Sequence, residues 1–276
     1  MTKSTINIRG RIIDLNEPIV MGIINLTPDS FYSASRKASV KNTLITAGQM
    51  LEEGASVLDL GGFSTRPGAA TVDEAEEHER VIPVLEAILR EHPEAIISVD
   101  SFRSSVARAA IEKGASIIND ITAGSDPEMF ALVASSKLPY IMMHMRGPVT
   151  NMMQDTSYSN LLHEMMLYFK ERIAELEARG AVDIIIDPGF GFSKTIDQNY
   201  EILKNLAYFE ALEQPILVGV SRKSMIYKFL ETSPEEALNG TSLLNYESLL
   251  KGARILRVHD VKEAVETIKL YKKIAC

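Results

Sequence analysis

Cysteine is almost absent from this sequence. The only one, Cys276, is the last of 276 residues. A single cysteine cannot form a disulfide within the chain, which excludes a small scaffold held together by disulfides and favours a reducing compartment. No partner motif lies near Cys276, so we assign it no catalytic role.

Long apolar runs and an excess of positive charge are also missing. No stretch approaches the roughly 18 consecutive apolar residues of a membrane span, and residues 1–16 do not follow the pattern of a signal peptide. We therefore expect a cytoplasmic protein with no membrane partner. The chain has 29 lysines and arginines against 37 aspartates and glutamates. A general nucleic-acid binder would show a basic field, so we expect no nucleic-acid partner, although a few local arginines can still bind a small anion.

The organisation of the chain is that of one domain, residues 1–276. No linker, charge block or change of composition divides it, and a (β/α)8 barrel typically needs about 250 residues. Short apolar runs alternate with longer helical patterns. Continuous apolar runs are typical of parallel strands buried on both faces. The eight predicted strands are residues 19–24, 56–60, 95–99, 116–119, 140–143, 183–186, 216–219 and 254–258.

The predicted helices carry recognisable ends. Gly54, Gly114 and Gly180 each follow a charged helical turn and precede an alanine and then a strand. Glycine after the last turn of a helix can adopt the left-handed conformation that ends it. The threefold use of one helix-to-strand connection favours a barrel. Side-chain caps with an acidic residue three positions later predict helix starts at Thr71, Ser125, Ser233 and Asp260.

Two architectures can hold eight strand–helix units, a closed barrel or an open doubly wound sheet. A dinucleotide-binding open sheet would show G-x-G-x-x-G after its first strand, where this chain reads Asn-Leu-Thr-Pro-Asp from Asn25 onward. We therefore predict an α/β fold, a (β/α)8 TIM barrel. Residues 6–16 are expected to form a short N-terminal β-hairpin that closes the bottom of the barrel.

Polar residues follow nearly every predicted strand, and in this fold the carboxyl ends of the strands form the active site. Asp100, Asn119 and Asp187 end strands three, four and six. Carboxylates accept hydrogen bonds and an amide both donates and accepts them, which suits a flat heterocycle with amino and ring N–H groups. Three apolar neighbours either cover its faces or belong to the ordinary core: Met143, Phe190 and Phe192.

A second set of strand-end residues is cationic or rich in donors. Strands eight, one and two adjoin where the barrel closes, so residues from all three can meet. Arginine matches phosphate oxygens with two parallel hydrogen bonds, which predicts an anion site. Surface charge remains the alternative, above all for Arg222. The set is Thr65, Arg66, Arg222, Lys223, Arg257 and His259, and Asn25 at the end of strand one can meet its members from strands eight and two.

The motifs that carry these residues resemble those of the dihydropteroate synthase family. They stand in the family's order and cover the chain from about residue 19 to about residue 270, which makes the resemblance specific as a set. They are residues 21–31, 59–69, 98–101, 117–121, 143–145, 187–192, 218–226 and 257–261.

The resemblance implies a reaction of folate biosynthesis, inhibited by sulfonamides. 4-Aminobenzoate attacks the exocyclic methylene of 6-hydroxymethyl-7,8-dihydropterin diphosphate, which gives 7,8-dihydropteroate and pyrophosphate. The implied pterin site is Asp100, Asn119, Asp187, Lys223, Met143, Phe192 and Gly219. The implied pyrophosphate site is Asn25, Thr65, Arg66, Arg257 and His259. The implied aminobenzoate pocket is Phe31, Ser221 and Arg222.

The resemblance further implies a homodimer and a Mg²⁺ ion, held by Asn25, phosphate oxygens and waters. Lys223, Arg257 and Asn25 are the implied catalytic residues. The chain departs from the family after Phe31, where it reads Tyr-Ser-Ala-Ser-Arg in place of an acidic residue and a Gly-Gly pair. This change concerns a loop expected over residues 26–41, which should order only with substrate bound.

Two other functions remain open. The departure after Phe31 favours a catalytically silent pterin-binding paralogue. A barrel that passes a methyl group from methyltetrahydrofolate to a corrinoid would share the pterin residues. That barrel would not need the Ser-Arg-Lys loop from Ser221 or the Arg-Val-His motif from Arg257.

Overall fold

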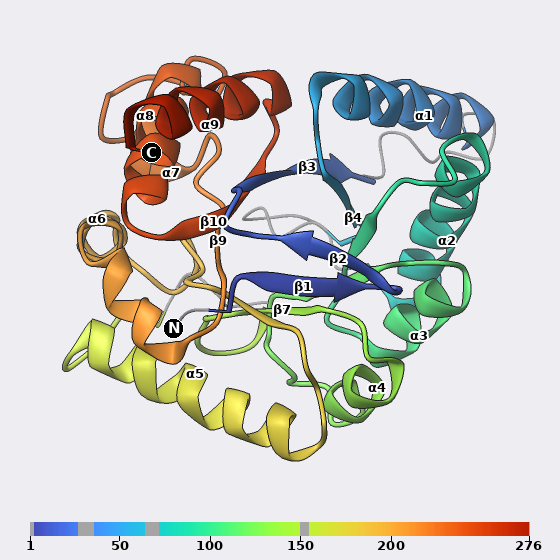
Figure 1. The fold of residues 1–276 in the computed structure, drawn as a ribbon, viewed down its shortest axis with the longest axis horizontal. Helices are drawn as coiled ribbons and strands as arrows, with labels where there is room; N and C mark the ends of the chain where they lie inside the picture. The colour runs from blue at the N-terminus through green and yellow to red at the C-terminus, as the bar shows by residue number, and fades with distance from the viewer. Residues whose placement is uncertain (1–2, 27–35, 64–71, 150–154, 276) are drawn as a thin grey trace.

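Eight parallel strands close into a barrel in the order β10-β3-β4-β5-β6-β7-β8-β9, which confirms the predicted TIM barrel (Figure 1). The computed structural model of the chain describes residues 3–26, 36–63, 72–149 and 155–275. The barrel strands are β3 (Ile19–Asn25), β4 (Val57–Gly61), β5 (Ile97–Asp100), β6 (Ile117–Asp120), β7 (Tyr140–Met143), β8 (Ile184–Asp187), β9 (Ile216–Val218) and β10 (Ala253–Val258).

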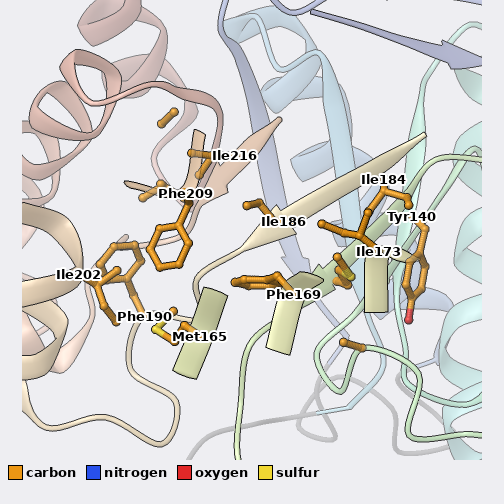
Figure 2. Close-up of a cluster of buried hydrophobic side chains, with 14 of the residues drawn as sticks. Tyr140, Met165, Phe169, Ile173, Ile184, Ile186, Phe190, Ile202, Phe209 and Ile216 are labelled. Carbon is orange, nitrogen blue, oxygen red and sulfur yellow. The ribbon is translucent and has the colours of Figure 1, made fainter. Parts of the chain in front are cut away.

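Helices surround the strands and bury their apolar faces against the outside of the barrel (Figure 1). Figure 2 shows part of this layer, where Phe169, Phe209 and Ile186 of β8 belong to one buried cluster. None of the described helices is long and apolar enough to cross a membrane. The helices are α1 (Arg36–Glu53), α2 (Glu74–Glu91), α3 (Ser104–Glu112), α4 (Met129–Ser136), α5 (Leu161–Ala178), α6 (Ile196–Lys204), the 3₁₀ helix Leu206–Leu212, α7 (Ser224–Tyr227), α8 (Leu238–Leu250) and α9 (Val261–Ala275).

The predicted N-terminal hairpin is present as β1 (Thr5–Ile8) and β2 (Arg11–Asp14). Its two turn residues, Arg9 and Gly10, both have positive φ angles (50° and 88°), as a tight hairpin turn requires. The hairpin closes the bottom of the barrel with Ile6, Ile8 and Leu15, all buried. They share one cluster with eight residues that lie on the barrel strands or, for Ile96, just before one: Met21, Val57, Ile96, Ile117, Ile141, Ile185, Leu217 and Ile255.

Side chains that point into the barrel change character from bottom to top. Successive residues of a strand face opposite sides, so every second residue points inward. On β4 the inward series runs from Val57 to Asp59, and on β8 from Ile185 to Asp187. β10 repeats the pattern and brings Arg257 into the upper layer. The lower layer is thus a sealed apolar core, and the polar side chains meet at the carboxyl ends.

Five barrel strands extend one residue further than the sequence predicted. Asn25, Asp100 and Asp187 are the last residues of their strands, not the first of a loop. The register pairs Asn25 with Gly61, Asp100 with Asn119, and Met143 with Asp187. Because a ladder fixes the backbone, these three side chains are held more rigidly than loop residues would be.

Two helices begin a few residues after their predicted starts. Thr71 lies outside the described residues, and α2 begins after Asp73, whose carboxylate accepts a bond from the N–H three residues on at 2.8 Å. α4 begins at Met129 and not near Ser125, so that prediction is wrong. Asp126 shapes this turn instead, because one carboxylate oxygen accepts the N–H of Glu128 at 3.0 Å. The other accepts the N–H of Ser104, at the start of α3, at 2.8 Å.

The last two predicted starts have different outcomes. Ser233 is wrong as a start, because α8 begins at Leu238. Glu236 accepts a bond from the Ser233 N–H at 3.4 Å, so the cap interaction is made in the turn before the helix. Asp260 does precede α9, but both of its carboxylate oxygens bind Arg222.

All three predicted helix ends are confirmed. Gly54, Gly114 and Gly180 have φ angles of +105°, +110° and +89°. In each case the N–H of the alanine that follows donates to the carbonyl five residues back, at 2.8 to 3.0 Å. This is the paired backbone hydrogen bonding that ends a helix at a left-handed glycine.

Candidate active site

One arginine joins two carboxylates at the centre of the upper layer. Arg257 on β10 donates from Nε to Asp59 on β4 and from Nη2 to Asp100 on β5, both at 2.7 Å. Asn119 on β6 donates from Nδ2 to the same Asp59 oxygen at 3.0 Å. The sequence assigned Arg257 to an anion half separate from the pterin half. In the structure it lies among the carboxylates, so the two halves share this residue.

Charge in this network is unbalanced, because two carboxylates share one guanidinium. The Asp59 side chain is fully buried and that of Asp100 is 19% exposed. Burial raises the pKa of Asp100 to about 7 and repulsion from Asp59 adds to the rise, while Arg257 opposes it. Burial would lower the pKa of Arg257, but the attraction of both carboxylates raises it. The arginine therefore stays charged, and Asp100 titrates near neutral pH.

The opposite side of the mouth holds Asp187 and Lys223. Asp187 ends β8, and its Oδ1 accepts the N–H of Gly189 at 2.7 Å. Burial raises the pKa of Asp187, an effect that Lys223 opposes. Lys223 donates from Nζ to the carbonyl of Phe190, and Nζ lies 4.7 Å from the centroid of the Phe192 ring. Burial lowers the pKa of Lys223 to about 8, and Asp187 opposes the fall.

The apolar residues predicted to cover a ligand separate into two groups. Met143 is buried in a small cluster with Ile121 and Met145, and partly exposed Phe192 packs against it. This cluster can form an apolar wall beside the carboxylates. Phe190 is fully buried in the layer between barrel and helices, where Figure 2 shows it near Met165. For Phe190 the alternative of ordinary core packing is therefore confirmed.

The segment after β9 brings together residues predicted for different subsites. Ser221 Oγ lies 3.0 Å from Nδ1 of His259, and the backbone N–H of His259 also donates to Ser221 Oγ at 3.2 Å. A Cβ at Gly219 would lie 3.8 Å from Cβ of Arg257, so this predicted pterin residue adjoins the central network. Arg222 has a different role. Its guanidinium is held by Asp260 at 2.8 and 2.9 Å and by two carbonyls before α8.

Asn25, the predicted metal contact, ends β3 and is exposed. Its Oδ1 and Oδ2 of Asp100 lie 3.9 and 3.7 Å from the point that a Cβ on Gly61 would occupy. Glycine at this position therefore leaves space between two oxygen donors. Residues 27–35 lie outside the described part of the chain, and residues 36–41, predicted as loop, belong to α1. Also outside the described residues are Phe31, Thr65 and Arg66.

Two residues of this region were missed by sequence reasoning. Asp59 received no role, although a carboxylate inside the apolar run 57–61 was a signal. Its Oδ1 is buried and has no hydrogen-bond partner among the described residues.

The second residue, Lys194, follows the motif at 187–192 and is only 4% exposed. Nothing in the sequence indicated this burial, because a lysine beside a glycine-rich loop is usually exposed. His144, inside another motif, packs against aromatic rings, and burial lowers its pKa to about 2.

Comparison with known proteins identifies the family of the chain. The profile of the pterin binding enzyme family matches residues 21–259. The dihydropteroate synthase of Escherichia coli K12 is 43% identical over 95% of this chain and 93% of its own length. That of Bacillus subtilis 168 is 41% identical over 91% of this chain and 87% of its own length.

Solved structures give the same result. A Yersinia pestis dihydropteroate synthase in complex with a sulfonamide drug has a TM-score of 0.91 and 37% identity, with 98% of each chain covered. A Xanthomonas albilineans dihydropteroate synthase with 4-aminobenzoic acid has a TM-score of 0.91 and 36% identity, over 100% of this chain and 99% of that one. The protein is thus a pterin-binding enzyme of the TIM-barrel class. Within that class it belongs to the dihydropteroate synthase family, whose members are transferases of folate synthesis.

Proposed function

We propose that this chain joins 4-aminobenzoate to 6-hydroxymethyl-7,8-dihydropterin diphosphate and releases pyrophosphate. The observation that carries the proposal is the convergence of Asp59, Asp100, Asn119, Asp187 and Arg257 at one mouth of the barrel. The aniline nitrogen forms a bond to the methylene carbon, the C–O bond to the diphosphate breaks, and the amine loses one proton. Pyrophosphate leaves with the electron pair of the broken bond.

The pterin lies, in this proposal, between the central network and the Asp187–Lys223 side. Its amino and ring N–H groups need acceptors, which Asp100 and Asp187 supply, and Asn119 adds an amide. Met143 and Phe192 pack against its faces, and Gly219 adjoins it. A buried acceptor left without a donor costs free energy, so the unpartnered Oδ1 of Asp59 supports a donor at this position.

The diphosphate lies at the other edge of the network. Among the described residues, Arg257 uses Nε and Nη2 for its hydrogen bonds, which leaves Nη1 for an incoming anion. His259 and Asn25 lie at the same edge, and we add Thr65 and Arg66 on the strength of the resemblance. Negative charge grows on the pyrophosphate as the C–O bond breaks. Cationic donors placed there therefore stabilise the transition state more than the substrate.

A Mg²⁺ ion fits this edge through the carboxamide oxygen of Asn25. Mg²⁺ prefers hard oxygen ligands and keeps several waters beside one or two protein groups and the substrate phosphates. The described residues contain no cluster of three histidine, cysteine or acidic side chains that could hold a metal ion. When bound, the ion would neutralise charge on the diphosphate oxygens.

The aminobenzoate pocket is proposed around Ser221, with Phe31 on the other side. Arg222 supports the pocket through the backbone, because its bonds to Asp260 fix the segment between β9 and α7. The backbone of Arg222 has a φ angle of +53°, which costs free energy in residues other than glycine. The two solved relatives with a sulfonamide and with 4-aminobenzoic acid support a pocket of this kind.

We also propose a cytoplasmic homodimer. The neighbouring helices α8 and α9 carry large exposed aliphatic side chains, Leu243 and Leu250 on one and Leu270 and Ile274 on the other. Exposed apolar side chains gathered on one side of a protein are typical of interfaces. Light scattering coupled to gel filtration should give twice the 30.5 kDa mass of the chain, and a monomer at every concentration would contradict the proposal.

Pyrophosphate release tests the proposed function directly. Purified protein is mixed with Mg²⁺, the dihydropterin diphosphate and 4-aminobenzoate, and each is then omitted in turn. Release that requires both organic substrates supports the synthase. Pterin binding without release would favour the silent paralogue. Methyl transfer from methyltetrahydrofolate to a corrinoid, without release, would favour the methyltransferase-like barrel.

A further inference from the structure

The amine of Lys194 is buried at the junction of two active-site loops. It is placed just before α6, and its Nζ donates to three backbone carbonyls: His144 at 3.2 Å, Gly189 at 3.0 Å and Phe192 at 2.9 Å. Among the described residues no carboxylate forms an ion pair with it. An ammonium group has three N–H donors and no acceptor, so these three carbonyls use its full capacity.

The three carbonyls belong to segments that form one wall of the site. His144 follows β7 and Met143, while Gly189 and Phe192 belong to the loop over residues 188–193 that follows Asp187. Because one nitrogen binds both segments, it fixes their spacing. It also fixes the loop at two points around the Phe190 carbonyl that accepts Lys223.

The loop itself is in a conformation that needs support. Gly189, Gly191 and Ser193 all have positive φ angles, 70°, 80° and 51°, and the last is unfavourable for a residue with a Cβ. Ser193 Oγ accepts the N–H of Arg146 at 2.9 Å and donates to the carbonyl of the same residue at 3.0 Å. A second, independent connection thus joins the same two segments.

We propose that Lys194 is a positioning residue of the pterin subsite. Its ammonium group holds residues 188–193 against the end of β7, so that Asp187 and Phe192 meet the pterin in one fixed geometry. The inference rests on the proposed function, because it assigns the pterin to this wall. Lys194 does not contact the substrate in this proposal, and the aminobenzoate pocket around Ser221 is not held by it.

The charge of the amine matters to this role. A neutral amine has only two N–H donors, so one carbonyl would lose its partner. Burial lowers the pKa of Lys194 to about 7, and Lys223 and Arg146 add to the fall, while Asp187 opposes it. The His144 ring beside it stays neutral. The carboxylate that favours the charged form of Lys194 is that of Asp187, which binds the pterin in this proposal.

The test compares Lys194→Met and Lys194→Arg with Lys170→Met, which removes an exposed lysine of α5. Loss of hydrogen bonds from a charged group predicts a rise in the KM and Kd for the dihydropterin diphosphate of about tenfold or more in Lys194→Met. The KM for 4-aminobenzoate and the control variant should change by less than about twofold, and Lys194→Arg should recover part of the loss. Amide exchange should become faster in residues 189–193.

Other outcomes would overturn the inference. If the KM values of both substrates rise together, or if only the melting temperature and the active fraction fall, Lys194 is a structural residue without a specific link to the pterin subsite. Unchanged exchange in residues 189–193 would contradict the mechanism even in a protein that shows no turnover. Absence of pyrophosphate release in the wild-type protein would instead count against the proposed function, and calorimetric binding of the pterin would still test Lys194.

Discussion

Single residues at the mouth of the barrel combine burial with charge. Asp100 and Asp187 are carboxylates in surroundings that disfavour ionisation, and Arg257 and Lys223 are the cations that offset them. Burial of a charge costs free energy unless a partner compensates it. In the upper layer a polar ligand can replace the missing water.

Asp187→Ala should strongly weaken pterin binding, because the amino edge of the ligand would lose a buried acceptor. Hydrogen bonds to charged groups contribute about 1.5–3 kcal/mol, which corresponds to at least about a tenfold loss of affinity. Asp14→Ala, in the hairpin at the far end of the barrel, is the matched control. Calorimetry with a pterin measures both, and equal affinity of the two variants would remove Asp187 from the pterin site.

Asp100 should make the stability of the protein depend on pH. Between about pH 4 and pH 7 the folded chain keeps a proton on Asp100 that the unfolded chain, with the ordinary pKa of 3.8, has lost. A rise in pH across this window therefore lowers the free energy of unfolding, and Asp100→Asn lacks this contribution. Urea unfolding at about pH 5 and about pH 8 should show wild type losing stability relative to the variant. A constant difference would contradict the raised pKa.

At the scale of elements, helix ends were easier to predict than helix starts. The residue just after a helix often adopts a left-handed conformation, which glycine tolerates best. Gly54, Gly114 and Gly180 therefore gave a clear signal. Many polar side chains can cap an N-terminus, and the choice depends on the turn before it. The capping box at the start of α6 joins Thr195 to Gln198, and a pattern with an acidic residue at the later position does not predict it.

Gly54→Ala should destabilise the protein, because residue 54 has a φ angle of +105° and a new Cβ would lie 3.3 Å from Val265. We expect a loss of about 1–2 kcal/mol in the free energy of unfolding. Gly48→Ala is the matched control in the same helix, where φ is ordinary and the nearest atom, on His92, is 3.5 Å away. It should be neutral or stabilising by about 0.5–1 kcal/mol. Thermal or urea unfolding measures both, and equal signs would refute the argument.

For the whole molecule, the barrel separates stability from function along its axis. The hairpin and the lower layer form an apolar plug, and the polar network lies at the other end. Because of this division, the upper layer can hold buried charges while apolar packing in the lower layer stabilises the fold.

Leu15→Ala tests the division, because Leu15 is fully buried beneath the barrel. Loss of a buried leucine typically costs about 2–5 kcal/mol of stability. The kcat and KM of the remaining folded protein should stay within about twofold of wild type, because Leu15 is in the bottom layer of the barrel. Urea unfolding and steady-state kinetics below the melting temperature give the two quantities. A large rise in KM would show that the plug shapes the site.

The sequence by itself determined the class of fold, the hairpin, the order of strands and most strand-end residues. Local signals suffice for these: continuous apolar runs, left-handed glycines, and polar residues at fixed intervals after strands. It also predicted which residues adjoin the mouth, because a closed parallel barrel brings the carboxyl ends of its strands together.

Only the tertiary structure decided which of those residues bind one another. Arg257 pairs with Asp59 and Asp100 across sequence separations of 198 and 157 residues, and Arg222 pairs with Asp260 although both were predicted for other roles. A side chain at a strand end has several partners within reach. Its choice depends on inward direction, strand register and the burial of the competing groups, which no single segment of the chain contains.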